Sequence, residues 1–131
     1  MKNEYIFPAI FTFEERGVSI EFPDLPGCLP CADNVEEAVK NAREALGLHL
    51  YGMEEDGEDI PAPSNAWDIK GGDKAVTMLI DVYMPSVRDK IRNRFVKKTL
   101  SIPYWLNVEA ERKGVNFSGV LQDALKSYLD V

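Results

Sequence analysis

The chain has 131 residues, of which 45% are hydrophobic, with two cysteines, one histidine and a net charge of −7. This length is enough for one modest α/β core and a small further module. No apolar run approaches the roughly 18 residues of a membrane-spanning helix, and no signal-type pattern opens the chain. We therefore expect a cytoplasmic protein that does not enter membranes.

Charge is divided unevenly along the sequence. Residues 1–84 hold six Lys or Arg against seventeen Asp or Glu, a net of −11, whereas residues 85–131 hold nine against five, a net of +4. Opposite charge in the two halves predicts two surfaces with different partners: a cationic partner for the front and a polyanion for the tail.

The front begins with strands. Residues 4–13 and 18–22 are rich in β-branched and aromatic residues, and the four residues 14–17 between them predict a hairpin turn. Pro8 lies inside the first run, which predicts an edge position or a bulge there. A turn rich in proline and glycine at residues 23–30 then leads into a brief third strand.

A helix and a further strand follow. Asn34 and Glu37 predict a capping box, with Asp33 and Glu36 as an alternative register. The apolar face expected for this helix comprises Val35, Ala38, Val39, Ala42, Leu46, His49, Leu50 and Met53. After a polar loop, residues 74–84 alternate as a strand does.

The tail predicts one strand and two helices. In residues 96–103, Lys97, Thr99 and Ser101 share one face, and the apolar residues share the other. A lone strand cannot satisfy its backbone, so we expect antiparallel pairing with the same strand of a second copy. One helix then runs from about residue 103 to 113, and a second runs from an Asn116 or Ser118 cap to residue 129.

Three segments of the tail resemble the ribbon-helix-helix family of DNA-binding proteins: residues 99–103, the turn at 113–118 and the helix at 120–125. In that family, a dimer lays a two-stranded ribbon into the major groove. The resemblance implies that Lys97, Thr99 and Ser101 face the bases. It also implies that the amides of Asn116, Phe117 and Ser118 hold a phosphate at a helix N-terminus. The plain alternative is a dimerisation tail that touches no DNA.

Four motifs of the front are specific in combination. They are Tyr5 to Ile10, the Pro-Asp-Leu-Pro-Gly-Cys run within Phe22 to Cys28, the capped helix Asn34 to Ala45, and Ile60 to Ser64. Together they resemble the HicB family, the antitoxins of HicA-HicB toxin-antitoxin systems.

The HicB resemblance implies an α+β fold with three parts. A partial RNase H-like α/β domain covers residues 1–84, a connector covers 85–94, and a ribbon-helix-helix domain covers 95–131. The implied partners are a HicA-like toxin, which is a small basic RNase that an acidic front can cover, and operator DNA. The chain would form a homodimer through residues 95–131, and a higher oligomer stays open.

We expect no enzyme activity, catalytic residue, metal or cofactor. Cys28 and Cys31 have redox-motif spacing but no helix at the first cysteine, so we expect structural thiols. With His49 they cannot complete a four-ligand zinc site.

Two other function classes stay open from the sequence. One is a stand-alone ribbon-helix-helix regulator whose front domain senses a ligand. The other is an RNase H-like nuclease using Asp24, Asp33 or Asp81.

The expected connector contains three arginines, which either reach phosphates or form a solvated helix face. They are Arg88, Arg92 and Arg94.

Overall fold

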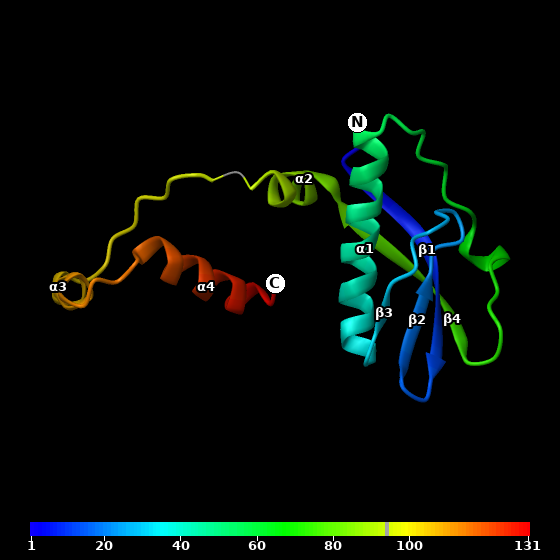
Figure 1. The fold of residues 1–131 in the computed structure, drawn as a ribbon, viewed down its shortest axis with the longest axis horizontal. Coiled ribbons are helices and arrows are strands. Elements are labelled where there is room, and N and C mark those ends of the chain that lie inside the picture. The colour runs from blue at the N-terminus through cyan, green and yellow to red at the C-terminus, as the bar shows by residue number, and fades with distance from the viewer. Residues whose placement is uncertain (94) are drawn as a thin grey trace. The chain divides into compact units, whose positions relative to one another are not determined.

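The computed structural model describes residues 1–93 and 95–131, so Arg94, one of the candidate phosphate contacts, lies outside the described residues. The chain divides into two compact units, Met1–Arg94 and Phe95–Val131. The first unit contains the sheet and the helices α1 and α2, and the second contains the helices α3 and α4 (Figure 1).

The first unit is built on a four-stranded antiparallel sheet with the order β3-β2-β1-β4. The strands are β1 (Glu4–Glu14), β2 (Gly17–Glu21), β3 (Cys31–Ala32) and β4 (Ala75–Tyr83). Glu14 pairs with Gly17, so the hairpin connection has two residues, shorter than the four expected. Gly17 has a φ of 152°, and a Cβ there would lie 2.5 Å from the Ala32 carbonyl oxygen, so only glycine fits this turn.

Pro8 lies where β1 has a neighbour on one side only. Pairing with β2 runs from Ile10 to Glu14, whereas β4 pairs along β1 from Glu4 onwards. The amide of Phe13 donates to the Lys74 carbonyl, which shows that odd-numbered β1 residues bond to β4. The missing donor of Pro8 therefore points to the side that β2 does not reach, and the expected edge position is confirmed locally.

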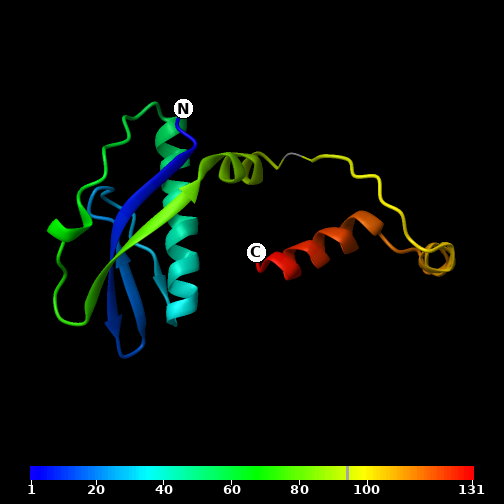
Figure 2. The same ribbon diagram turned by 180° about the vertical axis from the view of Figure 1, so that it is seen from behind.

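Helix α1 (Val35–Glu55) packs across one side of the sheet (Figures 1 and 2). The Asn34 side chain caps it by accepting a 2.9 Å hydrogen bond from the Glu37 amide, as predicted. Four residues of the predicted apolar face are fully buried against the sheet: Ala38, Ala42, Leu46 and Leu50. Two are not in the core, because Val35 is exposed at the first helical residue and His49 lies half-buried at the margin of the stripe.

Helix α2 (Met84–Arg92) follows β4 directly and packs against α1. The two helices approach closely at Gly47, where a Cβ would lie 2.9 Å from Val87 Cγ2. Most of the segment expected as a connector is thus a docked helix of the first unit. Apolar contacts explain why this helix docks: Val87 packs against the hydrophobic core, and Met84 is fully buried within it.

An ion pair fixes α2 in place. Arg88 Nη2 lies 2.6 Å from Glu54 Oε2 of α1, and the two side chains are only 10% and 7% exposed. The same guanidinium donates to the Lys2 carbonyl at 2.8 Å and to Asn3 Oδ1 at 3.1 Å. The hydrogen bond with Glu54 raises the pKa of Arg88 above its usual value. Arg88 is therefore a buried tie between three segments, neither a phosphate contact nor part of a solvated face.

The second unit has no buried side chain of its own. Helices α3 (Tyr104–Arg112) and α4 (Phe117–Leu129) lie where the sequence predicted helices, and residues 95–103 form neither helix nor strand in the single chain. Its exposed large apolar residues include Leu100, Ile102, Trp105, Leu106, Val120, Leu125 and Leu129. The strand at 96–103 stays a prediction, since it requires a second chain.

Across the described residues, none of the helices combines the length and apolarity needed to cross a bilayer.

We predict that replacing Arg88 with methionine destabilises the first unit. The change leaves the Glu54 carboxylate buried without its cation, which should lower the free energy of unfolding by about 2–3 kcal/mol. The matched control is Arg92→Met in the same helix, where a 3.7 Å pair with Glu55 is half-exposed. Its cost should stay below about 1 kcal/mol. Urea unfolding measures the free energy of unfolding of both variants. An equal loss in the two would contradict the role of Arg88 as a buried tie.

Candidate functional site

The three residues predicted to face DNA bases lie in the segment that precedes α3. Lys97, Thr99 and Ser101 are all exposed, and so are Leu100 and Ile102 on the alternate positions. Both faces of the segment are accessible in the single chain. Burying the apolar set against a second copy would leave the polar set pointing outward, because alternate side chains of a strand point to opposite sides.

The three residues predicted to hold a phosphate lie together at the start of α4. Asn116 is the N-cap, and its Oδ1 accepts a 3.1 Å hydrogen bond from the Gly119 amide. Phe117 and Ser118 are exposed and occupy the first helical positions, where amides have no preceding carbonyl of the same helix to bond. The cap forms as predicted, and the positive end of the helix dipole lies at these amides.

The positive charge predicted for the tail lies largely in the first unit. Residues 1–94 hold ten Lys or Arg against eighteen Asp or Glu, a net of −8, and residues 95–131 hold five against four, a net of +1. The difference from the sequence-based division comes from the segment 85–94, most of which is α2. Lys97 and Lys98 are the cations of the predicted ribbon segment, and Arg112, Lys113 and Lys126 are the other cations of the second unit.

Two of the four front motifs are joined by one carboxylate. Asp24, in the Pro-Asp-Leu-Pro-Gly-Cys turn, accepts a 2.9 Å hydrogen bond from the Ser64 amide and a 2.5 Å bond from the Ser64 hydroxyl. The Ile60 to Ser64 segment is thereby tied to the turn that follows β2. This tie gives the sequence combination a structural reason, and it occupies a carboxylate considered for nuclease chemistry.

Cys28, Cys31 and Asp81 are the other side chains considered above for redox or nuclease chemistry. Burial raises the pKa of the Cys28 thiol to about 11, so it stays protonated at neutral pH, and Cys31 is exposed and unbridged. Asp81 accepts a 2.9 Å hydrogen bond from Arg43 Nη2, which lowers its pKa. Within residues 1–93 and 95–131, no three His, Cys, Asp or Glu side chains gather as a metal site.

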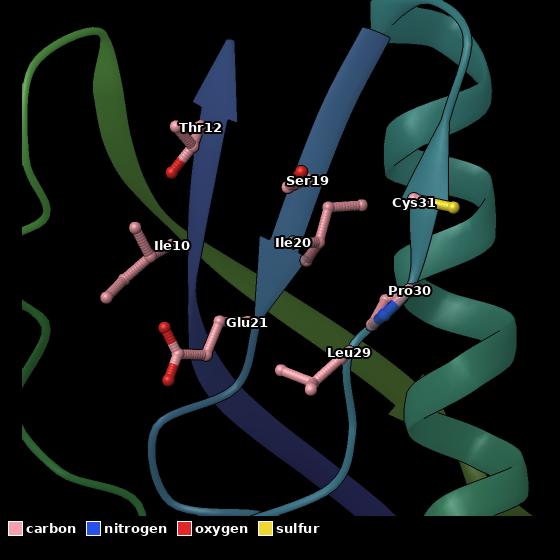
Figure 3. A pocket seen from close by; sticks show the side chains of 8 residues that line it. All are labelled: Ile10, Thr12, Ser19, Ile20, Glu21, Leu29, Pro30 and Cys31. Atoms are coloured by element: carbon pink, nitrogen blue, oxygen red, sulfur yellow. The ribbon is translucent and has the colours of Figure 1, made fainter. Parts of the chain in front are cut away.

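The first unit presents several hollowed surfaces. One is an acidic groove beside the last turns of α1, with a volume of about 640 Å³, lined by Leu48, Met53, Asp56, Glu58 and Asp59 among others. Another is a smaller hollow of about 310 Å³ on the side of the sheet away from α1. Figure 3 shows Thr12, Ser19 and Glu21 from β1 and β2 beside Leu29 and Cys31 from the segment that leads through β3.

We call the side of the sheet away from α1 the open face. The cross-strand register places Glu4 beside Tyr83, Ile6 beside Asp81 and Pro8 beside Leu79 on this side. The open face was not identified as a candidate site from the sequence. A signal for it is present in residues 75–83, because Leu79 and Tyr83 occupy positions that the alternation assigns to the exposed side of the strand. The Arg88–Glu54 tie was not identified either, since nothing in the spacing joins residues 34 apart.

These features define a two-unit α+β protein, in which a sheet covered on one side is followed by a helical unit without its own core. Residues 7–124 match the family model described as the HicB-like antitoxin of bacterial toxin-antitoxin systems. The chain belongs to this family.

Individual relatives agree with the assignment. The chain is 36% identical over 64 residues to Antitoxin HicB 2 of Photorhabdus laumondii, covering 49% of this chain and 46% of that protein. The chain spans less than half the length of the curated relatives it matches.

Solved structures with the same fold include two antitoxin-related chains. A chain of the toxin-antitoxin complex from Streptococcus pneumoniae has a TM-score of 0.57 at 23% identity, with 95% of this chain and 99% of that chain covered. The Burkholderia pseudomallei antitoxin HicB has a TM-score of 0.55 at 22% identity, with 92% and 96% covered. At these identities the likeness establishes the fold.

We predict that Asp24→Ala loosens the loop that carries Ser64. Loss of both hydrogen bonds should cost about 1–2 kcal/mol of unfolding free energy and speed hydrogen exchange in residues 57–65. Asp59→Ala removes an exposed carboxylate of the neighbouring groove and should stay within about 0.5 kcal/mol of the parent. Hydrogen-exchange mass spectrometry compares the two, and an unchanged loop in Asp24→Ala would contradict the tie.

Proposed function

We propose that this protein is an antitoxin that binds and neutralises a HicA-like, mRNA-cleaving toxin and regulates its own operon by binding operator DNA as a dimer. The observation that carries the proposal is membership of the HicB-like family in a chain with one strongly acidic unit and one coreless helical unit. Each unit then has its own partner.

The toxin partner is supported by charge. An RNase must offer a cationic surface to its polyanionic substrate, and a first unit with a net charge of −8 complements such a surface. One fold neighbour belongs to a toxin-antitoxin complex from Streptococcus pneumoniae. Occupying the RNA-binding surface of the toxin would stop cleavage without any chemistry in the antitoxin.

Dimerisation is supported by the apolar surface of the second unit. Leu100, Ile102, Leu106, Val120 and Leu125 are all at least 41% exposed in the single chain. Exposed apolar area on this scale in so small a unit favours burial against an identical copy. A two-stranded ribbon from two copies would bury Leu100 and Ile102 and complete the backbone pairing that one chain lacks.

DNA binding follows from the outward side of that ribbon. Two copies of Lys97, Thr99 and Ser101 would present six polar side chains to the major groove, where β-ribbons read bases. The amides of Asn116, Phe117 and Ser118 would hold a backbone phosphate at the positive end of α4. Short hydroxyl side chains at two of the three ribbon positions favour modest base discrimination.

We predict that the Lys97→Ala/Thr99→Ala double variant binds operator DNA at least about tenfold more weakly while remaining dimeric. The lost contacts lie on the outward side of the ribbon, so the chain-chain contacts stay intact. Electrophoretic shift and analytical ultracentrifugation measure the two properties. Full operator affinity in the double variant would remove the base-facing assignment.

The matched disruption lies on the other side of the same segment. Leu100→Asp places an unpaired carboxylate between the two chains and should abolish both the dimer and operator binding. A dimeric, DNA-binding Leu100→Asp variant would contradict the ribbon.

We predict that a fragment of residues 1–93 neutralises the toxin and that a fragment of residues 95–131 does not. The first fragment retains the whole core and the Arg88–Glu54 pair, which a fragment ending at residue 84 would break. Co-expression of each fragment with the toxin, scored by growth, tests the division. Rescue by residues 95–131 would reverse the assignment of the two units.

A further inference from the structure

We propose that the open face of the sheet is the surface on which the cationic toxin docks. The inference rests on the proposed function and adds the site at which the first unit acts. It commits to one occupant: a protein with an apolar centre surrounded by Lys and Arg.

The open face has an apolar centre. Ile6, Leu79 and Tyr83 are 53%, 61% and 52% exposed, and the β1–β4 register places all three on the side away from α1. Ile6 lies diagonally across the strand pair from both Leu79 and Tyr83, and Asp81 lies between those two residues, directly opposite Ile6. Exposed apolar side chains clustered on a sheet face mark an interaction surface more often than side chains scattered singly.

The charge carried by the strands on this face is negative, although the segment that covers part of the face contains Lys70. The four strands carry four carboxylates, Glu4, Glu14, Glu21 and Asp81, and the register places every one of them on the open face. The strands contain no Lys, Arg or His. Arg43 reaches the Asp81 carboxylate from α1, and in the part of the chain that the structure describes no ion pair joins Glu4 or Glu21 to a cation.

The chain covers part of the open face, and Pro8, which pairs with Leu79 on this side, is fully buried. Thr77 Oγ1 donates to the Ile69 carbonyl at 2.9 Å, and a Cβ on Gly71 would lie 2.7 Å from Ile10 Cγ2. The segment around residues 69–71 therefore packs over Ile10 and Thr77. Ile6, Leu79 and Tyr83, toward the start of β1 and the end of β4, stay accessible.

The negative charge of the open face favours a cationic protein over the other possible partners. A second copy docked through the same surface would bring two sets of carboxylates together, and nucleic acid would meet them with its phosphates; both contacts are repulsive. The second unit of another copy has a net charge of only +1, so it offers little attraction. A protein that binds RNA through a cationic surface is attracted over the whole face and can bury its apolar centre.

The test compares two leucines on opposite sides of the first unit. Leu79 on the open face and Leu48 beside the acidic groove of α1 are 61% and 60% exposed, so an arginine at either position is tolerated by the fold to the same degree. Full-length Leu79→Arg and Leu48→Arg are titrated calorimetrically with the HicA-like toxin of the same operon, inactivated at its catalytic histidine. Thermal unfolding confirms that both variants are folded.

We expect Leu79→Arg to weaken toxin binding by at least about tenfold, because an arginine meets the cationic partner at the apolar centre. Leu48→Arg should change the affinity by less than about threefold. A second pair tests charge alone: Glu21→Lys on the open face should weaken binding, and Glu44→Lys on the exposed side of α1 should not.

Each other outcome is decisive. Normal binding by Leu79→Arg, or equal loss in both leucine variants, overturns the open face as the docking surface, and loss in Leu48→Arg alone assigns docking to the groove beside α1. Absence of binding by the unsubstituted protein overturns the proposed function instead, and the docking surface with it.

Discussion

The first unit depends on a simple constraint: one long helix can bury only one side of a sheet. That side is shielded from water by four buried residues of α1: Ala38, Ala42, Leu46 and Leu50. The small side chains of the two alanines let the helix approach the strands closely. The other side must then face solvent or a partner. Its carboxylates keep it soluble, while Ile6, Leu79 and Tyr83 give it something to bury. The one-sided core thus generates both the stability of the unit and its candidate interface.

The second unit differs from the first, because none of its side chains is buried in the single chain. Two helices of nine and thirteen residues with exposed Leu106 and Val120 are too short to be stable by helix propensity alone. In the proposed dimer, the helices and the ribbon would both be stabilised by burial between two copies. If the proposed ribbon forms, a substitution at Leu100 or Ile102 would act on folding, dimerisation and DNA binding together, whereas one at Lys97 or Thr99 would act on binding alone.

Local patterns predicted most elements because their causes are local. The Asn34 and Asn116 caps, the alternation of β4 and the helix at 117–129 each depend on neighbours within a few residues. The failures involve distant partners. The sequence around Arg88 is typical of a surface cation, and only the approach of Glu54 and of the residues before β1, Lys2 and Asn3, makes it a buried tie. That tie moves most of the segment 85–94 into the first unit and removes most of the positive charge expected in the tail.

The tie also bears on how the two proposed activities are joined. Tyr83, at the edge of the open face, is the N-cap of α2, so a toxin docked there adjoins the helix that leads toward the second unit. In the proposed dimer, two acidic first units, each with a net charge of −8, would be linked to second units that contact a DNA backbone of the same negative sign. A bound cationic toxin would offset this repulsion at each unit. Toxin at low ratio should therefore tighten operator binding by electrostatics alone, without a conformational change in the ribbon.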